Sequence, residues 1–253
     1  MTEQQNRSTR GFAVFTLVMV ALFTGLGVWQ LQRRVEKHAL IAALDERLGA
    51  EPVPLPSASQ WAQLTPATNE FRRVRFDATY LPAPDAMVYS SGSAVREDIS
   101  GPGTWAFLPA RVAGGETVVV NTGFVPNTMQ ERSIEDRAVS PLVTGRAEPL
   151  SGYLRFAEKP GWLTPAENRA SRLWFARDHL AMAQALGWGE VAPFYIDLET
   201  PLPQSGVPRA GPLSVHLKDD HMQYAITWFG LAIAVVIAFI VWARGRRRAG
   251  VAV

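Results

Sequence analysis

The sequence predicts a membrane protein in which two transmembrane α-helices flank a β-rich α+β domain that lies outside the cytoplasm. Three observations carry this prediction. Of 253 residues, 47% are hydrophobic and only 19% are charged, whereas soluble domains average roughly 25% charged residues. Two stretches, 11–32 and 222–243, contain no Asp, Glu, Lys, Arg or His. Between them lie short runs in which polar and apolar residues alternate, as in half-buried strands.

Each charge-free stretch is long enough to cross a membrane, because a spanning helix needs about 20 apolar residues. Both have a Trp near one end, where an amphipathic ring prefers the headgroup region. The first stretch could instead be a cleaved signal peptide, since Arg7 and Arg10 precede it. Its apolar core is longer than the usual ~7–15 residues and no A-x-A cleavage site follows. We therefore expect a retained anchor.

Charge predicts the orientation of the two helices. Four Arg residues and no acid lie within 244–253, and such clusters stay in the cytoplasm. With two spans, both termini then lie on that side. The segment 38–243 carries 16 Lys/Arg against 21 Asp/Glu and has no basic stripe for nucleic acid. The expected divisions are a cytoplasmic N-terminus 1–10, a first span 11–32, an extracytoplasmic (periplasmic) domain 33–220, a second span 222–243 and a basic cytoplasmic tail 244–253.

The domain should begin with a helix that continues the first span. Val35, Leu40, Ile41, Leu44 and Leu48 recur at helical spacing, and a Pro-rich linker follows at 51–59. Near the other end, Asp178–Leu186 is predicted to be a helix that Gly187 and Gly189 stop.

Alternating patterns predict the strands between these helices. A Gly-Gly pair at 114–115 is typical of a hairpin turn. Few helices and many strands favour an antiparallel sheet that is closed or folded on itself. The expected strands are Arg72–Tyr80, Ala86–Ser90, Thr104–Val112, Thr117–Asn121, Val143–Phe156, Phe194–Leu198 and Leu213–Leu217.

Familiar enzyme motifs are missing from the sequence. The chain has no Cys, which excludes disulfides, zinc ribbons, thiol nucleophiles and covalent C-x-x-C-H haem attachment. It contains no dinucleotide fingerprint, P-loop, G-x-S-x-G or H-E-x-x-H. The sequence therefore predicts that the protein is not an enzyme.

Only four His residues are present, and three of them read as structural or surface residues: His38, His179 and His216. His221 differs, because it opens the second span with Tyr224 and Trp228 on the same predicted helix face. The first span ends at the same leaflet with Trp29, Gln30, Arg33 and Arg34. These could all be ordinary interface anchors and helix caps. They could instead form a haem pocket, since imidazole binds haem iron and Arg pairs with propionates.

Four motifs in order resemble the surfeit locus protein 1 family, the assembly factors of cytochrome c oxidase. Residues 26–33 resemble the family's L-G-x-W-Q-x-x-R, and residues 121–126 resemble its N-R-G-W-V-P. Pro165, Asn168, Trp174 and Asp178 are similar to its stretch before a helix. His221–Ala225 with Trp228–Phe229 is similar to its H-x-x-Y-A…W-F. The sequence departs from the family at Thr122 and Phe124, where the family has Arg and Trp.

The resemblance implies a two-span protein of a bacterial inner membrane that helps to insert haem a into the oxidase catalytic subunit. It implies His221 as the axial ligand and haem a synthase as the upstream partner. From spacing, we expect Tyr224, Trp228 and Trp29 to form pocket walls and Arg33 and Arg34 to meet the propionates. The alternative is a cofactor-free scaffold that holds the oxidase subunit through the acidic β-domain. A tethered periplasmic hydrolase is a third class, without a motif to support it.

Overall fold

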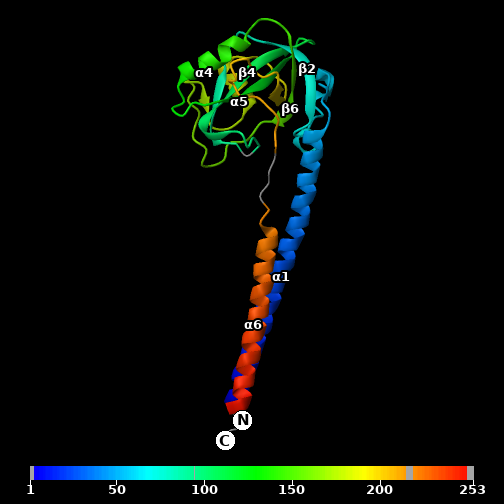
Figure 1. Cartoon of the computed structure of the whole chain (residues 1–253), viewed down its shortest axis with the longest axis vertical. Helices are drawn as coiled ribbons and strands as arrows, with labels where there is room; N and C mark the ends of the chain where they lie inside the picture. The colour runs from blue at the N-terminus through cyan, green and yellow to red at the C-terminus, as the bar shows by residue number, and fades with distance from the viewer. Residues whose placement is uncertain (1–2, 94, 215–218, 250–253) are drawn as a thin grey trace. The chain divides into compact units, whose positions relative to one another are not determined.

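A computed structural model of the chain describes residues 3–93, 95–214 and 219–249 (Figure 1). The chain divides into two units: a helical unit formed by 1–42 and 217–253, and a β-domain formed by 43–216. Each unit is described by itself.

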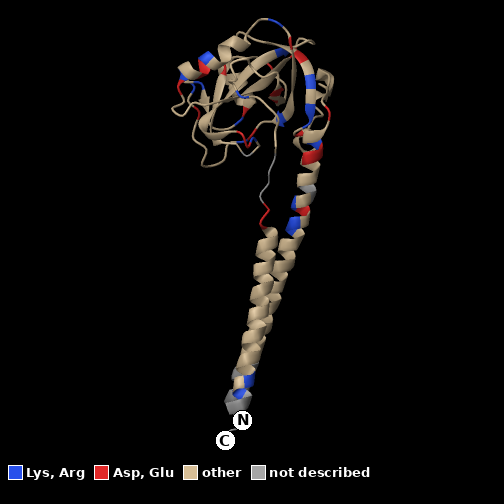
Figure 2. Ribbon diagram, viewed as in Figure 1, with Lys and Arg blue, Asp and Glu red and all other residues tan. Residues whose placement is uncertain are grey.

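Two long helices make up the helical unit. Helix α1 runs over Glu3–Gly49 and helix α6 over His221–Ala249. Their candidate membrane-spanning parts, Gly11–Gly49 and His221–Arg246, reach mean hydropathies of 2.2 and 2.5. Figure 2 shows both helices free of charge over their paired length, with Lys and Arg at the end of α6. The first predicted span therefore continues without a break into the predicted helix 35–48.

The two helices pack antiparallel through side chains spaced three and four residues apart. Phe12 lies 4.5 Å from Trp242 between ring centroids, and Phe23 stacks on Trp228 at 5.7 Å. Ala225, on the same face of α6, is buried. This spacing is that of a coiled-coil seam, in which each helix fills the gaps of the other.

The β-domain contains an eight-stranded sheet. Its order is β1-β2-β6-β8-β5-β4-β3-β7, and a further β2–β4 pairing closes β2, β6, β8, β5 and β4 into a ring. The strands are β1 Val53–Pro54, β2 Arg73–Tyr80, β3 Ala86–Gly92, β4 Ser100–Val112, β5 Thr117–Val125, β6 Glu148–Phe156, β7 Leu173–Trp174 and β8 Phe194–Thr200.

The β-rich α+β prediction is confirmed, but the sheet is mixed rather than wholly antiparallel. Parallel pairs join β1 to β2, β3 to β7 and β5 to β8. The chain reaches β8 from its parallel partner β5 through a long connection that contains helices, and such a crossover permits parallel pairing. The strand expected at 143–156 begins only at Glu148. Of the strand expected at 213–217, residues 213–214 are not in a strand and 215–217, with His216, lie outside the described residues.

Short helices cover the sheet: α2 Ala58–Trp61, α3 Pro66–Asn69, α4 Arg132–Val139, the 3-10 turn η1 Ser140–Leu142 and α5 His179–Leu186. The predicted ends of α5 are correct. The Asp178 carboxylate accepts a hydrogen bond from the Ala181 N–H at 3.0 Å, and Gly187 ends the helix at φ 70°, where glycine is not strained. Helix α4 was not predicted, because only Ile134, Ala138 and Val139 of its eight residues are apolar and so short a segment shows no repeating pattern.

Two buried clusters form the core of the β-domain. One fills the ring and includes Val74, Leu108, Val120, Leu154 and Ile196. The other packs α5 against the opposite side of the strands, through residues such as Phe107, Met182 and Tyr195. Burial of this much apolar surface is the main stabilising contribution to such a domain.

Candidate functional site

His221 lies at the end of the helix seam, at the first residue of α6, and faces Gln30 of α1. Its Nδ1 is 2.7 Å from Gln30 Oε1. An amide oxygen only accepts hydrogen bonds, so in this contact Nδ1 is the donor. The other ring nitrogen, Nε2, is not engaged by Gln30. An imidazole held in this way is suited to bind a metal through Nε2.

Asp219 contacts the backbone of His221 and the side chains of His38 and Arg34. Its Oδ1 accepts a hydrogen bond from the His221 backbone N–H at 3.1 Å, and its Oδ2 lies 2.6 Å from His38 Nε2 and 3.6 Å from Arg34 Nε. Desolvation opposes the effect, but the hydrogen bonds from His38 and from the His221 N–H hold the pKa of Asp219 below its usual range. The carboxylate thus caps α6 and stays charged.

One hydrogen-bond donor of the Arg34 side chain, its Nε, is not used among the described residues. This Nε is buried and has no hydrogen-bond partner, because Asp219 at 3.6 Å is too distant for a good hydrogen bond. A buried N–H without an acceptor costs free energy. An incoming carboxylate would relieve that cost.

Trp29 and Arg33 lie together on the exposed side of α1. The Arg33 guanidinium carbon is 5.8 Å from the centre of the Trp29 ring, and Arg33 also pairs with Glu36 at 2.8 Å. The Trp29 side chain is 48% exposed. The two residues therefore form a surface pair beside the seam.

The predicted common face of α6 divides in the structure. Trp228 turns into the seam and stacks on Phe23, whereas Tyr224 remains 55% exposed. The structure thus brings His221 together with Gln30, and Asp219 with Arg34 and His38. From the sequence, Gln30 was expected only among the residues at the membrane interface, and His38 only as a structural or surface residue. The contacts of Gln30 with His221 and of His38 with Asp219 join positions 191 and 181 residues apart, so no local sequence pattern predicts them.

The Asn121–Pro126 motif is a structural part of the β-domain. Asn121 Nδ2 donates to Asp197 Oδ1 at 2.6 Å, and Thr122 Oγ1 donates to the Ala106 carbonyl at 3.1 Å. Gly123 has φ 129°, and a Cβ there would lie 2.4 Å from the Arg209 carbonyl carbon. Asn121, Thr122 and Gly123 are buried, so this part of the motif holds β5 against its neighbours.

The other described histidines have structural surroundings. His179 is buried and its Nε2 donates to the Ala192 carbonyl at 3.1 Å. Burial lowers the pKa of His179 to about 4, so the ring is neutral. Among the described residues, no group of three or more His, Cys, Asp or Glu side chains could hold a metal ion.

Fold and site together define a class: a membrane protein in which one long apolar helix precedes a ring-like mixed sheet domain in the chain and another follows it, with a histidine at the end of the helix seam. The chain belongs to the SURF1 family, whose model matches residues 17–233. Members of this family are generally cytochrome c oxidase assembly factors and are not known as enzymes.

Relatives from animals and from a choanoflagellate support this assignment. Surfeit locus protein 1 of Rattus norvegicus is 34% identical over 231 residues, which cover 87% of this chain and 72% of the rat protein. The Homo sapiens protein of the same name is 32% identical, with 87% and 73% covered. A SURF1-like protein of Monosiga brevicollis is 30% identical, with 96% and 91% covered.

Proposed function

We propose that this protein is an oxidase assembly factor that carries haem a at the membrane interface and passes it to the catalytic subunit of cytochrome c oxidase. Haem a is its cargo, and haem a synthase and the oxidase catalytic subunit are its partners. The role in oxidase assembly follows from the family. The cargo and the residues that hold it are our proposal.

One observation carries the proposal: the hydrogen bond between His221 Nδ1 and Gln30 Oε1. It orients the ring and leaves Nε2 as the nitrogen that could bind iron. His221 is only partly buried, so a macrocycle could approach it from outside the seam. An open site of this kind suits a carrier that must release its cargo.

The neighbouring side chains suit the rest of the macrocycle. Arg34 has an unmet donor and Arg33 is half-exposed, so both can meet propionate carboxylates. Trp29 and Tyr224 expose broad aromatic surfaces against which a flat ring can pack. Trp228 would contribute the surface that its stacking on Phe23 leaves open.

An absorption spectrum tests the proposal. The full chain is produced in cells that make haem a, solubilised in mild detergent and purified, and pyridine identifies any bound haem. We expect a haem a spectrum that His221→Ala abolishes and that Gln223→Ala, an exposed neighbour on α6, leaves unchanged. Free imidazole should restore part of the spectrum to the His221→Ala protein, since it can replace the missing ring.

A second pair of variants isolates the orienting role of Gln30. Replacing a hydrogen-bond partner of a metal ligand typically weakens binding about 10–100-fold. Gln30→Ala should therefore raise the Kd for haem a by about that factor, whereas Gln32→Ala, an exposed position two residues along, should not. A colourless wild-type protein from cells that do make haem a would refute the proposal and favour the cofactor-free scaffold.

A further inference from the structure

Strand β3 lies near the edge of the sheet, and its outer side is paired with another strand over only part of its length. Strand β7 pairs with it at Met87 and Val88. Beyond these two residues, Tyr89, Ser90 and Gly92 pair with β4 on one side, and Tyr89–Gly92 have no strand partner on the other among the described residues. Ser90, Ser91 and Gly92 place no charge on this edge, although charged side chains are a common protection against strand addition.

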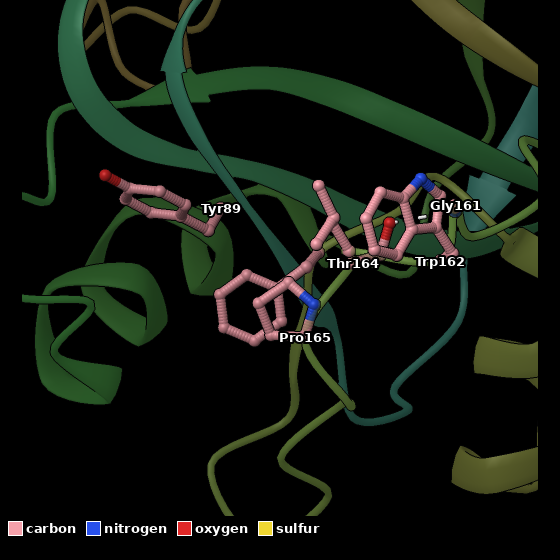
Figure 3. A pocket seen from close by; sticks show the side chains of 7 residues that line it. Tyr89, Gly161, Trp162, Thr164 and Pro165 are labelled. Atoms are coloured by element: carbon pink, nitrogen blue, oxygen red, sulfur yellow. Dashed lines mark hydrogen bonds between the residues drawn. The ribbon is translucent and has the colours of Figure 1, made fainter.

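An aromatic hollow of about 520 Å³ lies beside this edge (Figure 3). Figure 3 shows Tyr89 and Trp162 at its two sides with Thr164 and Pro165 between them. Trp162 is 92% exposed and Leu163 is 74% exposed. Exposure of two adjacent large apolar side chains to water costs free energy, and exposed apolar patches typically mark binding surfaces.

A second hollow of about 240 Å³, the donor hollow, adjoins the first. The two share Tyr89 and Phe175, whose rings meet edge to face at 6.1 Å. Strand β3 contributes Val88, Tyr89, Ser90 and Gly92 to the donor hollow. One groove therefore follows the uncovered half of β3, with an aromatic part and a polar part.

Arg177 and Trp105 line the donor hollow and both carry N–H donors. The Arg177 guanidinium lies 4.7 Å over the Trp105 ring, and its side chain is only 12% exposed. Its contact with Asp197 is 3.7 Å, too long for a hydrogen bond. Trp105 is buried, and among the described residues its Nε1 has no hydrogen-bond partner.

The surrounding charges favour a neutral acceptor. Arg155 is already paired with Glu70 at 2.5 Å and with Asp197 at 2.7 Å, and Glu158 lies at the rim. With Arg177 this makes two positive and three negative side chains. A dianion such as phosphate would be repelled, whereas backbone carbonyl groups would satisfy the donors without added charge.

We propose that this groove binds an extended apolar segment of a partner polypeptide, which adds as a strand to the free edge of β3. An apolar side chain fills the aromatic hollow between Tyr89 and Trp162, and backbone carbonyls accept from Arg177 and Trp105. Main-chain pairing provides affinity and the pocket provides selectivity in this mode of recognition. The inference does not rest on haem binding.

Photo-crosslinking tests this proposal in the full chain in its own membrane. The photoreactive residue p-benzoylphenylalanine replaces Trp162, and in a control it replaces Met129, which is 76% exposed and does not line either hollow. We expect an adduct at 162, absent at 129, that mass spectrometry maps to an extended apolar segment of another protein.

A second variant tests the backbone pairing. Ser91→Pro removes the backbone N–H of the one residue in 89–92 that has no partner in the β3–β4 register, and losing a single hydrogen bond to the added strand should lower the yield of the adduct about fivefold. Ser91→Ala should leave it unchanged, and melting curves of both variants show that the domain folds. Adducts with lipid alone, adducts within the chain itself, equal yields at 129, or a yield that a folded Ser91→Pro protein retains would each overturn the proposal.

Discussion

Glu135 shows how burial sets the charge of a single residue in the β-domain. It lies on α4 with 0% of its surface exposed. Its Oε2 accepts from the Thr104 hydroxyl at 2.6 Å, and its Oε1 has no partner. Burial raises the pKa of Glu135 to about 7, against the opposing effect of the Thr104 hydrogen bond. The carboxyl group is therefore largely protonated in mildly acidic solution.

This pKa makes stability depend on pH. From the ordinary pKa of 4.5 up to about 7, the folded chain holds a proton that the unfolded chain releases. The free energy of unfolding should therefore fall as pH rises through this window, by up to about 3 kcal/mol. Glu135→Gln keeps an acceptor for Thr104 and removes the titration. We expect its melting temperature to exceed that of the parent by several degrees at pH 8 and to match it at pH 5.

The control for this experiment is Glu131→Gln, on the exposed residue that precedes α4 and whose side chain makes no cap. Thermal melts of the full chain in detergent at both pH values compare the three proteins. An unaltered pH dependence in Glu135→Gln would show that Glu135 is not the group responsible.

At the scale of elements, α1 and α6 approach each other closely at Gly27. A Cβ at this position would lie 2.6 Å from the Phe229 ring, whereas a Cβ at Gly25 would meet nothing within 4 Å. The two glycines are two residues apart in the same helix. They therefore form a matched pair that separates the effect of helix contact from the effect of helix propensity.

We expect Gly27→Leu to separate the helices and Gly25→Leu to leave them paired. The chain has no Cys, so a Phe23→Cys/Trp228→Cys pair at the stacked position can report the seam through a single disulfide. Its oxidation yield, followed by gel migration, should fall strongly with Gly27→Leu and remain high with Gly25→Leu. Equal yields would mean that the seam tolerates a large side chain at residue 27.

Helices and strands that are marked by neighbouring residues could be predicted from the sequence. The strands with which they pair, and the helices on which they pack, could not. Asp178 and Gly187 mark the ends of α5 through their own hydrogen bond and φ angle. The parallel pairing of β5 with β8 depends on residues far apart in the chain. Helix α4 has only eight residues, too few to show a repeating apolar pattern. The two spans contain no charged residue, so hydropathy locates them but does not reveal which face forms the seam.

In the candidate site, too, the sequence predicts what neighbouring residues mark but not the contacts between distant residues. The motif at 221–228 marks His221 in the sequence, and the structure leaves its proposed role as a ligand open to experiment. The contacts of His221 with Gln30 and of Asp219 with His38 require two helices to meet. Sequence spacing within one helix therefore placed Trp228 and Tyr224 on one side, but packing against α1 draws only Trp228 inward.

At the scale of the whole molecule, charge should set the orientation in the membrane. Arg244, Arg246, Arg247 and Arg248 follow the apolar part of α6, and basic residues next to a span stay on the cytoplasmic side. Both termini would then be cytoplasmic and the β-domain periplasmic. That orientation would place His221 at the outer surface of the membrane.

Reporter fusions test this orientation. Alkaline phosphatase joined after Ala50 should be active, because it would be exported, and a green fluorescent protein joined at the C-terminus should fluoresce, because it would fold in the cytoplasm. Replacing the four arginines by alanine removes most of the charge difference across α6 and should reduce the fluorescence of the C-terminal fusion. The opposite pattern, an inactive phosphatase after Ala50 with a dark C-terminal fusion, would place His221 on the cytoplasmic side, where the proposed delivery of haem from the periplasmic surface could not occur.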